Sequence, residues 1–431
     1  MIEREVSGFR YLLLAEKEPK ETKKRTAAKM RTIVGKKAGY TGMILALYIL
    51  GRGIPLPWVT YTPTAETGFQ SFLLQMIGAQ TRSGSLLSLG LMPWMTASIV
   101  SALFRAVMHA DTARSSPAHA RRMTALLGLV VALVQAYVTA ARLKYRDGYF
   151  SSPLFRSAAT ILVLMGGAFA VAWLAEQNRL HGIGGQTALI LINVESSLAG
   201  QVMLAFGGTD TKALSPAETA LGILFTVLSI LLTMLFENAE IRIPIRHVML
   251  HSDLAGDDYL AVKLNPSGMM PVMYVMSLFV LPYCLCRALS WFYPDNPALL
   301  YVADNLNLNT GFGIAIYSAL LVAMTFALAF LFINPSEIAG SMQENNDIIP
   351  GLRPGQDTRR EIRRNVLFAA FCSAAVLFLV VAVPMICRQA MHSSSDLFTL
   401  STSLCILVGL WNTVLDEVRV LRTLDRYHPF L

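Results

Sequence analysis

The sequence predicts an all-α integral membrane protein whose chain crosses the bilayer ten times. Apolar residues make up 54% of the 431 residues and charged residues only 15%, which is too little charge to cover a soluble protein of this length. The charges come in clusters, and many of the uncharged runs between them approach about 20 residues, the length of a helix that spans the hydrocarbon core. Because lipid cannot hydrogen-bond to the backbone, each run should be a helix.

The charged residues that flank each apolar run set the boundaries of the predicted spans. The ten spans are Ala38–Gly51, Leu86–Phe104, Met123–Ala141, Ser157–Ala175, Thr187–Phe206, Thr219–Phe236, Pro266–Cys286, Gly311–Ile333, Asn365–Ile386 and Leu397–Leu415. Residues 1–30 are polar and lack a signal peptide's apolar core, so we expect a cytoplasmic tail or an interfacial helix. Residues 31–431 should form one domain with five-span halves at about 31–206 and 219–420. An inverted repeat is compatible with this arrangement, but we find no residue-level self-similarity.

Basic residues predict the orientation of the chain. With ten spans, both termini lie on one side, together with the segments 105–122, 176–185, 237–263 and 334–364. These regions carry roughly three quarters of all Lys and Arg, and such an excess marks the cytoplasmic side. Both termini should therefore be cytoplasmic, although the basic segment Arg142–Arg156 falls outside. The net charge of +8 has the same explanation, so we expect no nucleic-acid partner.

Few residues point to chemistry. The five cysteines lie in or beside apolar runs without metal-binding spacing, so we interpret them as small buried hydrophobic residues. The sequence has no phosphate-binding loop, no dinucleotide-binding glycine motif and no HExxH motif. His247 and His251 are four residues apart but have no third ligand nearby. We expect no catalysis, no cofactor and no metal.

The segment between the first two spans has two interpretations. GRGIPLPWV (Gly51–Val59) ends the first span, and Gly68–Ser85 then contains an apolar stretch too short to cross the bilayer. It is either an ordinary external loop or a half-helix that dips into the bundle, and a dip would imply a pore. The apolar residues of this stretch are Phe69, Phe72, Leu73, Leu74, Met76 and Ile77.

Two other spans carry a proline near their start and are rich in methionine. Pro93 lies in LGLMPWMTASIV and Pro271 in NPSGMMPVMYVMS. Routine packing of kinked helices explains either span alone. Two kinked spans in corresponding places indicate adjustable packing, because Met side chains repack readily.

Glu195 interrupts the fifth span. Acidic residues inside a membrane usually face a cavity or a partner. Glu195 is therefore either the coupling site of a small-solute transporter or a residue that faces the water of a wide channel. A third option is that the predicted span is out of register by one turn.

The segment Ile333–Arg364 is long and charged, and its sequence IPGLRPGQ predicts a rigid turn around Arg353. It is either a solvated loop that obeys the charge rule or a docking surface for a partner, since Arg held in a fixed geometry is favoured at interfaces. The segment Glu237–Lys263 is a second candidate surface.

In their order, these motifs resemble the SecY family, the channel subunit of the general secretory translocon. The resemblance covers about residues 31–431 and rests on seven pieces: GRGIPLP, LLSLGLMPWMTASIV, AEQNRLHGIGG, RIPI, KLNPSGMMPVMYVMSLFVLP, INPSEIA with IPGLRPGQDT, and STSLCILVGL. Three stretches, LMPWMTA, RHVMLHSDLAGDDYLAVKLNP and MYVMSL, are more similar to the accessory channel of Gram-positive bacteria than to the housekeeping channel.

The resemblance implies ten helices around an hourglass pore in the bacterial plasma membrane. The half-helix after the first span would be the plug, and spans 2 and 3 against 7 and 8 would form a lateral gate. An apolar ring would seal the waist, because a narrow hydrophobic constriction excludes water and ions. By matched position its members are Leu91, Met95, Leu191, Met273 and Ile406. The fifth span departs from housekeeping channels, which are apolar where this chain has Asn193 and Glu195.

The resemblance also implies the partners. The substrate would be an unfolded preprotein, similar for an accessory channel to large serine-rich, glycosylated surface adhesins. An accessory SecA-type motor ATPase would dock on the cytoplasmic loops, and small SecE-like or accessory single-span subunits and membrane lipid would surround the channel. The candidate docking residues are Arg242, Arg353, Arg359 and Arg360. The alternatives are a housekeeping SecY, a solute transporter that uses Glu195, and an insertase or structural subunit without a pore.

Overall fold

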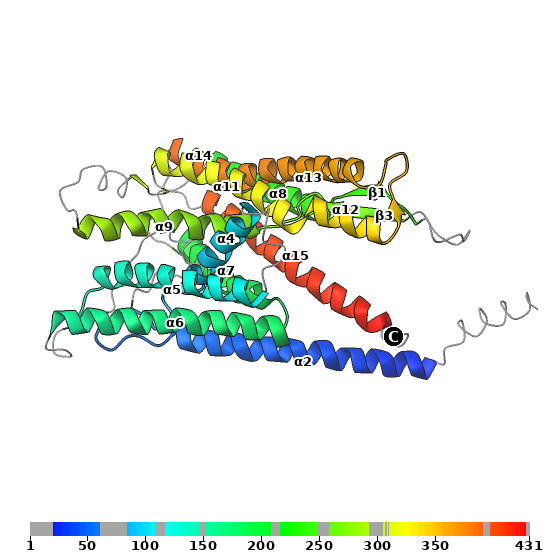
Figure 1. Ribbon diagram of the computed structural model, residues 1–431. Helices are drawn as coiled ribbons and strands as arrows, with labels where there is room; N and C mark the ends of the chain where they lie inside the picture. The colour runs from blue at the N-terminus through cyan, green and yellow to red at the C-terminus, as the bar shows by residue number, and fades with distance from the viewer. Residues whose placement is uncertain are drawn as a thin grey trace, which may run out of the picture.

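The chain forms an elongated bundle in which most helices run side by side (Figure 1). The computed structural model describes residues 20–60, 84–107, 117–146, 152–207, 216–247, 258–292, 305–306, 308, 310–390 and 397–427. Each of the ten predicted spans coincides with a helix, which confirms the all-α prediction. In chain order these are α2 (Lys20–Arg52), α4 (Met92–Val107), α5 (Pro117–Arg142), α6 (Pro153–His181), α7 (Gly185–Gly207), α8 (Pro216–Asn238), α9 (Met270–Phe292), α11 (Gly311–Phe332), α13 (Gln356–Leu377) continued by η2 (Phe378–Ala382) and α14 (Val383–Ala390), and α15 (Leu397–Tyr427).

Helix length and hydropathy agree with a membrane protein. Within the described part of the chain, four helical segments are long and apolar enough to cross a bilayer: Arg121–Ala141, Pro153–His181, Gly311–Glu344 and Gln356–Cys387. Two shorter apolar helices, Gly222–Asn238 and Met270–Cys286, add to them.

The two helices α4 and α9 begin later than the sequence predicts. Residues 86–91 and 266–269, which were assigned to spans 2 and 7, are turns. Gly90 and Gly268 have φ of 55° and 56°, a backbone conformation that glycine adopts at little cost. Pro93 and Pro271 are each the second residue of their helix, where a missing N–H does no harm. The predicted kinks at these prolines are therefore wrong.

These two helix starts share one sequence pattern, Gly-x-Met-Pro-x-Met. It runs from Gly90 to Met95 before and into α4, and from Gly268 to Met273 before and into α9. The glycines have nearly the same φ, and the final methionines are buried in the same core cluster. The expectation that the halves share no residue-level similarity is wrong for this motif.

The ninth span contains a short π-helix at η2. Pro384 follows it and has no N–H to donate to the carbonyl of Val380. The hydroxyl of Thr402 in α15 donates a hydrogen bond to this carbonyl at 3.3 Å, so a neighbouring helix satisfies the group that proline leaves free. Helix α15 thus contacts the ninth span at its irregular turn.

The connections at one end of the bundle fold into a module of their own, which we call the loop module. It consists of β1 (Glu240–Pro244), β2 (Arg246–His247), β3 (Tyr259–Lys263), α12 (Pro335–Glu344), β4 (Asp347–Ile348) and the start of α13. Strands β1 and β3 pair antiparallel, as do β2 and β4. The module has a separate hydrophobic cluster that includes Ile243, Val262, Met342, Ile349 and Ile362. The segment Ile333–Arg364 thus has a folded core, and its arginines are exposed.

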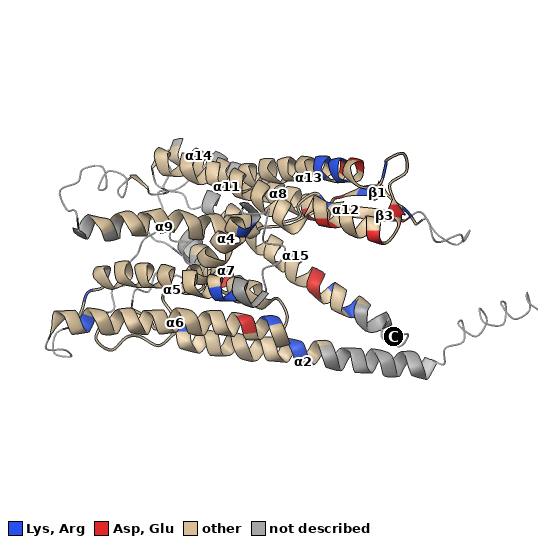
Figure 2. Ribbon diagram, viewed as in Figure 1, with Lys and Arg blue, Asp and Glu red and all other residues tan. Residues whose placement is uncertain are grey.

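Charged residues gather at the end of the bundle that holds the loop module (Figure 2). The start of α2 and the end of α15 lie at the same end (Figure 1). Helix α15 joins the two halves there, because the Glu417 carboxylate accepts a hydrogen bond from the Gly184 amide at 2.8 Å while Asp416 pairs with Lys263 at 2.7 Å. Both described ends of the chain thus share one side, as an even number of crossings requires.

Candidate functional site

The five predicted ring residues all belong to the main hydrophobic core or pack against it. Leu91, Met95, Met273 and Ile406 are between 0% and 3% exposed and belong to one buried cluster. Leu191 is partly buried and packs against that cluster. They come from the turn before α4, from α4 and α9, and from α15 and α7, so five separate segments contribute. An apolar cluster of this kind offers no hydrogen-bond partner to water or ions.

The helices that would form a lateral gate are in contact. Helix α4 packs against α9 and α11, and α5 packs against α9. The Thr96 hydroxyl of α4 lies 3.2 Å from the backbone carbonyl of Ser277 in α9 and 2.9 Å from that of Met92 in its own helix. Both Thr96 and Ser277 are fully buried, so this hydrogen bond ties α4 to α9 inside the core.

Several buried polar atoms near these helices have no partner. Both amide atoms of Gln135 in α5 and the hydroxyls of Ser277 and Tyr317 make no hydrogen bond with the described residues. Burying a polar group without a partner costs about 1–3 kcal/mol. The interface between these helices is therefore less stable than one that buried only apolar groups, or one in which every buried polar group had a hydrogen-bond partner.

The predicted plug residues, from Phe69 to Ile77, lie outside the described residues. Glu195 is exposed on α7, and Asn193 on the same helix is fully buried. The side-chain oxygen of Asn193 accepts hydrogen bonds from Tyr48 and Arg52 of α2. The two polar residues of the fifth span thus have different surroundings.

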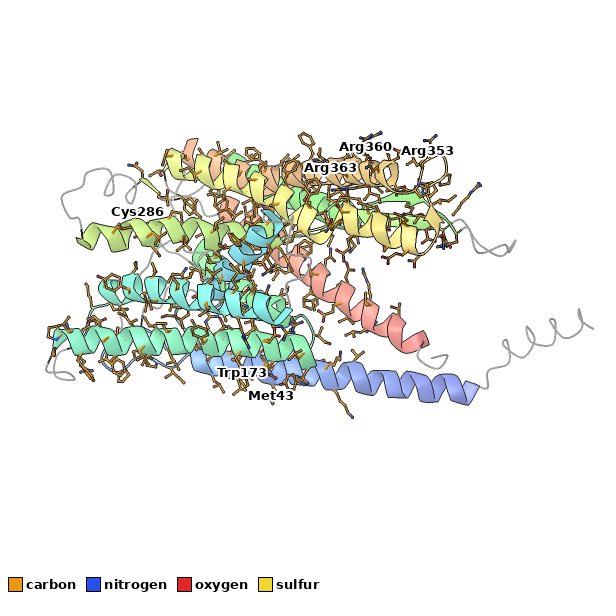
Figure 3. All side chains as sticks on the ribbon, in the orientation of Figure 1. Met43, Trp173, Cys286, Arg353, Arg360 and Arg363 are labelled. Atoms are coloured by element: carbon orange, nitrogen blue, oxygen red, sulfur yellow. The ribbon has the colours of Figure 1, made fainter. Side chains whose placement is uncertain are left out.

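The predicted docking residues all lie on the loop module. Arg353, Arg359 and Arg360 are exposed, and none has an ion-pair partner among the described residues. Figure 3 shows Arg353, Arg360 and Arg363 along one outer edge near the start of α13. Arg353 lies in a turn between Gly351 and Gly355, whose φ values are 86° and 105°. Their positive φ explains why the sequence places glycine on both sides of Arg353.

Arg242 differs from the other three. Its guanidinium pairs with Glu240 at 2.8 Å and lies over the Tyr259 ring, 4.7 Å from the ring centroid. Glu240 therefore offsets its charge, and the hydrogen bond that Arg242 donates to this carboxylate raises the pKa of Arg242. Arg242 thus stabilises the hairpin of β1 and β3. The charges of Arg353, Arg359 and Arg360 remain available for a binding partner.

The position of the arginines in α13 is unfavourable for the helix itself. Arg359 and Arg360 lie at the end of its first turn, where the helix dipole disfavours positive charge, and Arg363 and Arg364 follow one turn later. Among the described residues, only Arg364 of these four has a carboxylate partner, Glu361 at 3.6 Å, and the Arg364 side chain is exposed. Contacts within the helix do not account for this cluster of arginines.

His247 is a residue whose role sequence reasoning missed. Its imidazole contacts Asp347 on β4 through Nδ1, and its Nε2 lies 3.2 Å from Asp258. The hydrogen bond to the Asp347 carboxylate, with a smaller contribution from Asp258, raises the pKa of His247. His247 thus joins two connections of the loop module that are about 100 residues apart in the chain. No group of three or more metal-ligating residues forms within the described residues, and His251 lies outside them.

Comparisons with known proteins agree with this geometry. The SecY family model matches residues 85–415. The accessory Sec system protein translocase subunit SecY2 of Streptococcus oralis is 33% identical over 92% of this chain and 98% of its own length. The SecY2 of Leuconostoc gelidum is 28% identical over 92% of this chain and 96% of its own.

Two solved structures are similar in fold. "The structure of a protein conducting channel" gives a TM-score of 0.63 at 17% identity, and covers 92% of this chain and 94% of that one. Sec61 in the canine ribosome-channel complex from the endoplasmic reticulum gives a TM-score of 0.60 with the same identity and coverage. At this identity the likeness concerns the fold alone.

The His247 contact predicts a pH-dependent stability. Because the folded-state pKa of His247 is raised above its ordinary value of 6.5, the contact stabilises the fold fully below that value and is lost as pH rises through the folded pKa. The unfolding midpoint of the wild type should exceed that of His247→Gln at about pH 6, and the difference should disappear by about pH 9.

His181→Gln is the control, because the His181 ring stacks on Tyr40 and has no carboxylate partner among the described residues. A difference between wild type and His247→Gln that stays constant from low to high pH would contradict the proposed contribution.

Proposed function

Because the chain belongs to the SecY family, we propose that it is the protein-conducting channel subunit of an accessory Sec system in a bacterial plasma membrane. It passes unfolded preproteins outward through the bundle, and a separate ATPase supplies the energy. The cargo class that we propose is that of large serine-rich, glycosylated surface proteins. Both termini and the loop module lie on the cytoplasmic side in this proposal.

One observation carries the channel function. The predicted ring residues are spread from Leu91 to Ile406, yet all of them contribute to one apolar cluster that helices from both halves surround. Two of the members are methionines at the same position of the repeated Gly-x-Met-Pro-x-Met motif. Unbranched, flexible Met side chains can close around one another at rest and part around a passing peptide.

The loop module supports the docking of a motor. Its hydrophobic cluster and the β2–β4 pairing hold two connections as one body, so Arg353 and the arginines of α13 have a fixed arrangement. A rigid basic surface suits an acidic protein partner, because little side-chain and loop entropy is lost on binding. An accessory SecA-type ATPase is the partner that we propose, with small SecE-like or accessory single-span subunits in the membrane.

No observation on the described residues favours the solute transporter. Glu195 is exposed, and the buried acceptor of the contact between α7 and α2 is Asn193. The matches to known proteins are to translocase subunits and protein-conducting channels.

The accessory role predicts a selective export defect. After deletion of this gene, quantitative proteomics of the cell surface and medium should find one or a few large serine-rich proteins missing while other exported proteins persist. Reintroduction of the gene on a plasmid is the control. Loss of viability or a broad export defect would instead assign the chain to the housekeeping role, and an unchanged set of exported proteins would contradict the channel function.

The ring predicts that a polar substitution makes the resting channel leak. Ile406→Asn should raise the resting ion leak of the full-length channel in liposomes that contain a chloride-sensitive dye, because an amide in the constriction lets water enter. Leu410→Asn is the matched control: Leu410 lies one turn further along α15, is 2% exposed and belongs to the same cluster, but is not a ring residue. Equal leaks from both variants would show that any polar core substitution has this effect and would remove Ile406 from the seal.

The docking surface predicts that charge reversal weakens the motor contact. Arg353→Glu should reduce the affinity for the co-purified SecA-type motor about tenfold or more, as expected when an interface arginine is lost and replaced by a repelling charge. The control is Arg146→Glu, which reverses an exposed charge in the connection between α5 and α6. Insertion of each variant is checked by its yield in the membrane fraction. Wild-type affinity of an inserted Arg353→Glu channel would argue against the docking role.

A further inference from the structure

A buried polar contact joins α2 to α7 beside the predicted ring. Tyr48 of α2 is fully buried in the main hydrophobic cluster, and its hydroxyl donates a hydrogen bond to the side-chain oxygen of Asn193 at 3.0 Å. One turn further along α2, the Arg52 guanidinium donates to the same oxygen at 3.1 Å and to the Ser196 hydroxyl at 3.3 Å. Two donors from α2 therefore converge on one acceptor of α7.

This contact fixes the orientation of the Asn193 amide. Because Tyr48 and Arg52 both donate, the oxygen of the amide must face α2. Its nitrogen is then buried without a hydrogen-bond partner among the described residues. An apolar pair, with leucine at 193 and phenylalanine at 48, would leave neither this amide nor the Tyr48 hydroxyl buried in the core. Such a pair would lack the directional bonds that Asn193 accepts from α2, and these bonds have a consequence for the geometry of α7.

The directional bonds determine the rotation of α7 about its axis. Successive residues of an α-helix are about 100° apart, so Leu191 points roughly opposite to Asn193. When Asn193 faces α2, Leu191 faces away from α2 and packs against the cluster that holds the other ring residues. Glu195 lies one turn from Leu191 on the same side of the helix and is exposed. A rotation of α7 about its axis would therefore move the Leu191 side chain out of the ring. It would also change the position of the Glu195 carboxylate relative to the ring.

We propose that Asn193, Tyr48 and Arg52 form a positioning network that holds α7 in the rotation in which Leu191 completes the apolar ring. The network does not touch the passing peptide; it acts through Leu191. This inference rests on the proposed channel function and extends it to residues outside the ring. The apolar ring packs without directional bonds, and the network supplies the directional contact that such packing lacks.

The chain offers a matched pair of variants for the test. Tyr48 and Tyr317 are both fully buried tyrosines of the main cluster, but the Tyr317 hydroxyl has no hydrogen-bond partner among the described residues. Tyr48→Phe removes a hydrogen bond to Asn193, whereas Tyr317→Phe removes an unpaired hydroxyl. The full-length variants are reconstituted in liposomes with the chloride-sensitive dye, and the resting leak and the unfolding midpoint are measured.

We expect Tyr48→Phe to raise the resting leak about fivefold over Tyr317→Phe, the population change that corresponds to one lost hydrogen bond of about 1 kcal/mol. Asn193→Leu, which removes the acceptor, should leak more than Tyr48→Phe. Asn193→Asp keeps an acceptor for both donors and should leak as little as the wild type. A purely structural role would lower the unfolding midpoint of Tyr48→Phe and leave its leak equal to that of Tyr317→Phe, and this result would overturn the proposal.

The Ile406→Asn channel separates the two ways in which the proposal can fail. If Ile406→Asn raises the resting leak while Tyr48→Phe and Asn193→Leu do not, the ring forms the seal, but the network has no role in positioning it. If Ile406→Asn is also tight, the ring itself is wrong, and the role of the network is overturned with it.

Discussion

The left-handed backbone of two glycines sets the position of the central helices. Gly90 and Gly268 both have φ near 55°, and each helix that follows begins two residues later with a proline in its first turn. Met95 and Met273 then occupy equivalent places one turn into α4 and α9, and both enter the main cluster. A side chain at either glycine would be strained in this conformation. The start of the helix, and with it the place of the ring residue, depends on this local constraint.

Apolar runs predict where the chain crosses the membrane, but not where its helices end. Helix α13 begins at Gln356 although its predicted span begins at Asn365, and α15 continues to Tyr427 beyond the predicted end at Leu415. Hydropathy measures only the part in lipid, whereas contacts in water continue these helices. Ile362 of α13 is fully buried in the core of the loop module, and Asp416 of α15 pairs with Lys263. Such contacts join segments far apart in the chain, so a local pattern cannot indicate them.

The same limit explains which parts of the candidate site the sequence predicted. Ring residues were assigned by matched motifs, and the structure brings them into one cluster because their helices pack in the middle of the bundle. His247 was considered only as a metal ligand, since its partner Asp347 belongs to a connection 100 residues away. Pro93 and Pro271 were interpreted as kinks because the sequence does not tell whether a proline lies inside a helix or in its first turn. The glycine three residues before the proline in both motifs was the available signal for a helix start.

The polar residues of α7 and the apolar ring have complementary roles in a seal. An apolar constriction must be adaptable, since it closes on itself at rest and opens for a peptide, and hydrophobic packing without directional bonds permits such adaptation. Because such packing has no directional bonds, it only weakly defines the rotation of each helix that carries a ring residue. A hydrogen-bonded asparagine on the opposite side of α7 defines that rotation without adding a polar atom to the constriction. Asn193, which by sequence seemed to argue against a place for α7 in the ring, is then the residue that allows Leu191 to take part in it.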